Sequence, residues 1–109
     1  MTLQARTSET VVLPASLTIR TVQSTKDVLL AGLAAGDSVV VHVPDDADCD
    51  LSFVQLLEST RMFAQTHDKV VTLFSPATTG LLSILERGGF LTAMDPSDRF
   101  FWFHERQMQ

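Results

Sequence analysis

A short acidic stretch of this chain gathers several side chains that could do chemistry. Read in order, its residues are Asp45-Asp46-Ala47-Asp48-Cys49-Asp50-Leu51-Ser52-Phe53. Carboxylates can bind a divalent cation, a cysteine can act as a nucleophile, and a serine hydroxyl can accept a phosphoryl group. Each of these functions requires different residues nearby.

The spacing of the aspartates does not match a calcium-binding loop. Such a loop needs a glycine at its sharp turn and a glutamate at its far end, and the residues that follow Asp45 supply neither. We therefore interpret the run from Asp45 to Asp50 as a solvent-exposed loop, which could also repel unsuited partners or contact a basic one. No metal ion or cofactor is predicted.

Cys49 is the only cysteine of the chain, so no internal disulfide can form, and a reducing compartment is indicated. The surrounding carboxylates disfavour its thiolate, which is the opposite of what a nucleophile needs. His42 lies in an apolar strand pattern and His67 near a predicted helix end, where structural roles are more usual. Without a nucleophile–base pair, a glycine-rich phosphate loop or a metal spacing, we expect no enzymatic activity.

Ser52 lies where a strand pattern gives way to a helix pattern. Residues 38–43 are typical of a strand buried on both faces, and residues 53–64 repeat apolar side chains at helical spacing. We expect Ser52 to be the N-cap of this helix. The hydroxyl could serve only as a cap, or it could also accept a phosphate, which the helix dipole favours and the nearby Asp48 and Asp50 oppose.

The remaining pattern predicts one α/β domain over residues 1–109, with a polar and flexible segment at 1–9. On the helix after Ser52, we expect Glu58, Arg61 and Gln65 to face water. The fold class is a mixed sheet of four to five strands with helices and central parallel crossovers. The expected elements are strands at 10–13, 17–19, 38–43 and 69–74, a helix over 21–34, a helix starting at Ser75-Pro76, and a short strand starting at Phe90-Leu91.

Near the end of the chain, Phe100-Phe101-Trp102-Phe103 are four consecutive aromatic residues. We expect them in a terminal edge strand, from which they cannot all face one core. Two should pack inward, and two should be available for a homodimer or another protein contact.

Composition narrows the function classes further. The formal net charge is −5, which argues against nucleic acid as the main partner. The longest apolar run, residues 28–35, is too short to span a bilayer, and residues 1–10 show no secretory signal. The sequence therefore predicts a cytoplasmic protein without direct membrane insertion.

The order of these elements, with Asp50-Leu51-Ser52-Phe53 opening the central helix, resembles the STAS domain family over residues 10–94. The family motif is Asp-(Ser/Thr)-(Ser/Thr)-Gly, so Asp50 and Ser52 match, whereas Leu51 and Phe53 depart from it. Ser75-Pro76-Ala77 is also similar to the family at that point. Ala15-Ser16-Leu17-Thr18 lacks the glycine and the aspartate of the family's Gly-x-Leu-Asp.

The resemblance implies a bacterial regulatory protein-interaction module similar to anti-sigma-factor antagonists. Its partner would be a serine or sensor kinase or an anti-sigma factor, with Asp50, Leu51, Ser52 and Phe53 at the contact. Ser52 matches the position that partner kinases phosphorylate in the antagonists. The alternative that the family offers is a constitutive subunit of a lipid-transport ABC complex, which contacts the ATPase without phosphorylation.

Overall fold

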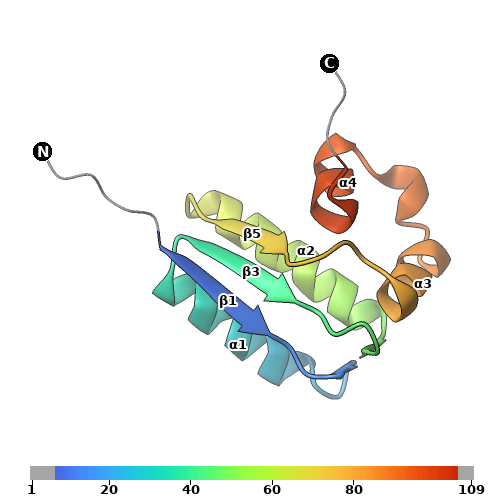
Figure 1. Ribbon diagram of the computed structural model, residues 1–109, viewed down its shortest axis with the longest axis horizontal. Coiled ribbons are helices and arrows are strands. Elements are labelled where there is room, and N and C mark those ends of the chain that lie inside the picture. The colour runs from blue at the N-terminus through green and yellow to red at the C-terminus, as the bar shows by residue number, and fades with distance from the viewer. Residues whose placement is uncertain (1–6, 106–109) are drawn as a thin grey trace, which may run out of the picture.

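The computed structural model describes residues 7–105, in which a small parallel sheet has helices behind one face and further helices beyond one edge (Figure 1). Residues 1–6, part of the predicted flexible segment, lie outside the described residues. The elements are β1 (Ser8–Val12), β2 (Ser16–Leu17), α1 (Val22–Ala35), β3 (Ser38–His42), β4 (Asp48–Cys49), α2 (Leu51–Thr66), β5 (Val70–Leu73), α3 (Thr79–Arg87), a 3-10 turn (Leu91–Ala93) and α4 (Pro96–Phe103).

The strands pair only in parallel within the described part of the chain. A three-stranded sheet has the order β1-β3-β5, and β2 pairs separately with β4. In the register of the larger sheet, Val41 lies between Val11 and Leu73. The predicted α/β class with parallel crossovers is therefore confirmed, because α1 connects β1 to β3 and α2 connects β3 to β5. The prediction of one mixed sheet is wrong over residues 7–105.

Helices α1 and α2 cover one face of the three-stranded sheet, behind it in Figure 1. Val39 and Val41 point toward them and are each 1% exposed, whereas the alternate residues Val40 and His42 are half-buried. Phe74, just after β5, is 61% exposed and its ring lies 4.7 Å from that of His42. The prediction that residues 38–43 are buried on both faces is wrong, because a mostly apolar run does not reveal that no helix within residues 7–105 covers the second face (Figure 1).

The chain after β5 differs most from the sequence-based expectation. Ser75-Pro76 does not open a helix; α3 begins at Thr79. The intervening loop is held to α4, since the Ala77 N–H donates to the Trp102 carbonyl at 2.8 Å. Phe90 precedes a 3-10 turn rather than opening a strand. These tertiary contacts override the local Ser-Pro start signal.

The four aromatic residues at 100–103 lie on a helix, not on the predicted edge strand. Helix α4 begins with a capping box in which the Asp95 side chain accepts from the Asp98 N–H and the Asp98 side chain accepts from the Asp95 N–H, with Pro96 in the first turn. This start signal explains why a β-favouring aromatic run is helical here. At the other end of the chain, Ser8 and Glu9 belong to β1 rather than to the flexible segment predicted over residues 1–9.

Within residues 7–105, the helices are too short or too polar to cross a membrane.

Candidate functional site

The N-terminal end of α2 brings together the two residues that match the STAS motif. Asp50 is the N-cap, and its carboxylate accepts from the Ser52 N–H at 3.0 Å. The Ser52 hydroxyl donates to the same carboxylate oxygen, Oδ1. The prediction that Ser52 is the N-cap is therefore wrong. The cap lies two residues earlier, because an aspartate serves this position as well as a serine does.

The turn after β2 also contacts the N-terminal end of α2. The Ile19 N–H donates to the other oxygen of the Asp50 carboxylate at 2.8 Å, and the Asp50 N–H donates to the Leu17 carbonyl at 3.2 Å. The turn after β2 is thereby held beside the start of α2. The contact could not be found from the sequence, because nothing in Leu17-Thr18-Ile19 signals a partner 31 residues away.

The surface around Ser52 combines polar and apolar groups. Ser52 itself is half-buried, while Ile19 is 66% and Leu51 is 44% exposed. Phe53 points into the core and is 1% exposed, so its side chain offers no contact surface to a partner. Of the four residues expected at the contact, three lie at the surface and Phe53 supports them from inside. We refer to Ile19, Asp50, Leu51 and Ser52 as the Ser52 surface.

Hydrogen bonds to its carboxylate lower the pKa of Asp50 below the ordinary value of 3.8. The Ser52 hydroxyl is the largest cause, and the backbone N–H groups of Ile19 and Ser52 add to it, while partial desolvation opposes the shift. Asp50 therefore carries its negative charge directly beside the Ser52 hydroxyl. A second anion placed on Ser52 would meet this charge.

Cys49 does not have the properties of a nucleophile. It is 8% exposed, and burial together with the charges of Asp48 and Asp50 raises the pKa of its thiol from 9.0 to about 11. The thiol is therefore protonated at neutral pH, as expected from the acidic neighbours. Among residues 7–105, no three histidine, cysteine or acidic side chains are grouped so that they could hold a metal ion.

A second polar cluster, around Arg61, was missed by the sequence reasoning. Arg61 was expected to face water, but its side chain is only 11% exposed and lies 3.2 Å from both Glu58 and Asp98. Its guanidinium lies 4.3 Å from the centroid of the Phe101 ring. The Trp102 indole N–H donates to Glu58 at 3.0 Å. The cluster joins α2 to α4. The three-residue spacing of Glu58 and Arg61 is compatible with an ion pair on one helix. It gives no sign of the contacts with Asp98, Phe101 and Trp102 on α4.

The cluster also determines which of the four aromatic side chains at 100–103 are exposed to solvent. Phe101 is 5% and Trp102 0% exposed, so neither is available for the predicted homodimer contact. Phe100 is 51% exposed and Phe103 half-buried. Two of the four aromatic side chains thus pack inward, as predicted, but they are neighbours on a helix rather than alternate residues of a strand.

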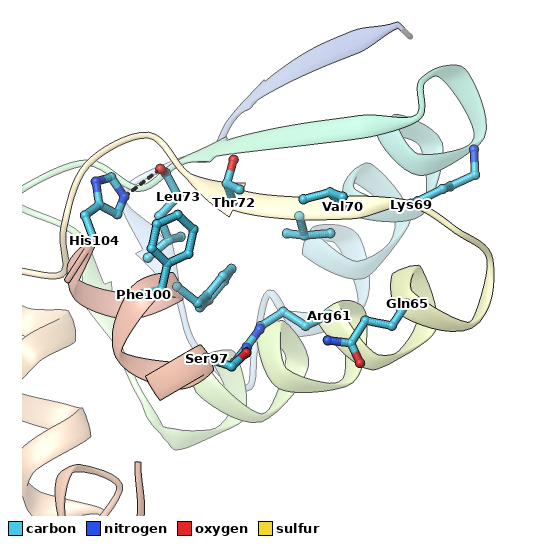
Figure 2. A pocket seen from close by; sticks show the side chains of 11 residues that line it. Arg61, Gln65, Lys69, Val70, Thr72, Leu73, Ser97, Phe100 and His104 are labelled. Carbon is cyan, nitrogen blue, oxygen red and sulfur yellow. Dashed lines mark hydrogen bonds between the residues drawn. The ribbon is translucent and has the colours of Figure 1, made fainter. Parts of the chain in front are cut away.

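Between α4, the second half of α2 and the outer edge of β5 lies a pocket of about 470 Å³ (Figure 2). Its lining includes Phe100, Gln65 and Val70, and His104 closes one end by a contact of 3.0 Å from Nε2 to the Leu73 carbonyl. We refer to this pocket as the β5 groove. It was not predicted, because α4 was expected to be a strand.

Comparison with models of protein families, with curated proteins and with solved structures finds no match to this chain.

Proposed function

We propose that this chain is a non-enzymatic regulatory module of the STAS type, which binds a protein partner through the Ser52 surface. The observation that carries the proposal is the position of the Ser52 hydroxyl, hydrogen-bonded to Asp50 and flanked by the exposed side chains of Ile19 and Leu51. Exposed apolar groups favour association with another protein. A hydroxyl among them can change the local charge when it is phosphorylated.

Phosphorylation of Ser52 by a partner kinase would end such a contact. The kinase would transfer the terminal phosphoryl group of ATP to the serine oxygen, with release of ADP and of the hydroxyl proton, and the new group carries a charge of about −1.5 to −2. It could then no longer donate to Asp50, and the phosphate would lie beside that carboxylate. A partner covering Ile19 and Leu51 would have to bury two uncompensated anions, which costs several kcal/mol per ion. The phosphorylated protein therefore dissociates.

The proposal is tested with tagged variants expressed in the source cells. Partners that are recovered with the wild type should also be recovered with Ser52→Ala and be lost with Ser52→Asp. The matched control is Ser59→Asp, which adds the same charge at an exposed position of α2 and should retain the partner. Intact-mass analysis should find one phosphoryl group on a fraction of the wild type and none on Ser52→Ala.

One outcome would contradict the proposal. Equal recovery of the partner with Ser52→Ala and Ser52→Asp would exclude a charge switch at this position. If that partner were an ABC-transporter ATPase, the result would support the alternative function, a constitutive subunit of a lipid-transport complex.

A further inference from the structure

The carboxylate of Asp50 joins the start of α2 to the turn after β2, residues 18–21. Its Oδ2 accepts from the Ile19 N–H at 2.8 Å, and its Oδ1 accepts from the Ser52 N–H at 3.0 Å and from the Ser52 hydroxyl. One planar group therefore holds Ile19 with one oxygen and Ser52 with the other. A movement of this group that is caused at Ser52 also changes the bond to Ile19.

The turn after β2 can move without unfolding the elements around it. It is closed by a bond of its own, since the Thr21 N–H donates to the Thr18 carbonyl at 2.9 Å. The bond from the Asp50 N–H to the Leu17 carbonyl, at 3.2 Å, joins backbone groups and does not depend on where the Asp50 side chain lies. Ile19 is 66% exposed, so water can replace the carboxylate as the acceptor of its N–H.

A phosphate on Ser52 would reverse the interaction between Ser52 and Asp50. The hydroxyl donates a proton to Oδ1, whereas the phosphorylated oxygen has no proton to donate and carries a group with a charge of about −1.5 to −2. The N–H groups at the start of α2 attract an anion, and the phosphate would compete with the carboxylate for them. Repulsion and competition both act to displace the Asp50 side chain.

We propose that the Asp50 side chain couples phosphorylation of Ser52 to the position of the turn after β2. The phosphate displaces the carboxylate, the Ile19 N–H loses its acceptor, and the turn becomes mobile. The inference rests on the proposed phosphorylation of Ser52 and specifies how that site is regulated. Because Ile19 is an exposed apolar part of the Ser52 surface, phosphorylation changes the shape of this surface as well as its charge.

The test compares the full-length, isotope-labelled protein with the same protein carrying phosphoserine at position 52, incorporated during synthesis. NMR measures the hydrogen exchange of single amides. The Ile19 amide should exchange about tenfold or more faster in the phosphorylated protein, because a hydrogen bond to a charged acceptor is lost. The Leu57 amide, inside α2, should exchange slowly in both. Phosphoserine at position 59, exposed on the same helix, is the matched control and should leave Ile19 unchanged.

Asp50→Asn tests whether the coupling runs through the carboxylate. Asparagine caps a helix as well as aspartate does, but it has a single carbonyl oxygen. With this oxygen on the Ser52 N–H, its amide group faces the Ile19 N–H, and two donors cannot bond. Ile19 should therefore exchange fast in Asp50→Asn without any phosphate, and phosphoserine at position 52 should cause no further increase. Asp48→Asn, at an exposed neighbouring position, should keep the slow exchange of the wild type.

Three results would overturn the proposal. These are an Ile19 amide that phosphoserine at position 52 leaves unchanged, equal acceleration by phosphoserine at position 59, and slow exchange of Ile19 in Asp50→Asn. The measurement uses neither the kinase nor the partner. Failure of the coupling is therefore seen at the Ile19 amide, whereas failure of the proposed function is seen as equal recovery of the partner with Ser52→Ala and Ser52→Asp.

Discussion

At the scale of single residues, one carboxylate organises the Ser52 surface. Asp50 caps α2, anchors the Ile19 N–H at 2.8 Å and accepts the Ser52 hydroxyl. The position of this site could be predicted from the sequence, because a strand pattern followed by capping residues and a helix pattern is a strong local signal. Which residue is the N-cap could not be predicted from the sequence, since Asp50 and Ser52 are equally good capping residues.

The hydrogen bond between Ser52 and Asp50 predicts a shift in acidity. Replacing Ser52 by alanine removes the largest cause of the lowered pKa, so the pKa of Asp50 should rise toward 3.8. NMR titration of the side-chain carboxyl measures the change, and Ser59→Ala is the control, for which no change is expected.

The same lowered pKa predicts how stability depends on pH. A carboxylate with a folded-state pKa below its unfolded value stabilises the fold above the unfolded value, near 3.8 for Asp50. This contribution is lost as the pH falls through the folded-state pKa. The free energy of unfolding should therefore differ between wild type and Ser52→Ala at neutral pH, and the difference should shrink in acid. A difference that stays constant with pH would contradict this assignment.

At the scale of elements, α4 is the main departure from the sequence-based expectation. Aromatic residues favour strands, but the capping box of Asp95 and Asp98 starts a helix, and the contacts of Trp102 with Glu58 and Ala77 hold it against the rest of the protein. The partners of Trp102 are distant in sequence. Local patterns therefore predicted α1, α2 and the three main strands, but not α4.

Two alanine substitutions distinguish the helix from the predicted strand. In a strand, Phe100 and Trp102 would share one face and their replacement would have similar effects. In the helix, Trp102 is fully buried and Phe100 is 51% exposed. Trp102→Ala should lower the free energy of unfolding by about 3–5 kcal/mol, and Phe100→Ala by no more than about 0.5 kcal/mol. Denaturant unfolding measures both, and equal losses would contradict the helical assignment.

At the scale of the whole molecule, α1 and α2 cover one face of the three-stranded sheet (Figure 1), and two surface features lie along α2. The Ser52 surface lies at the start of α2, and the β5 groove lies beside its second half (Figure 2). The parallel α/β class was predictable because the apolar runs alternate with helical patterns. The open sheet face and the β5 groove were not predictable from the sequence, since both depend on where α4 packs.

The central claim is that a phosphate on Ser52 releases the partner. The most direct measurement separates the partner-bound from the free pool of wild-type protein from the source cells and determines the intact mass of each. We predict that protein phosphorylated at Ser52 is confined to the free pool and that the bound pool is unmodified. Phosphorylated Ser52 at the same fraction in both pools would contradict the claim.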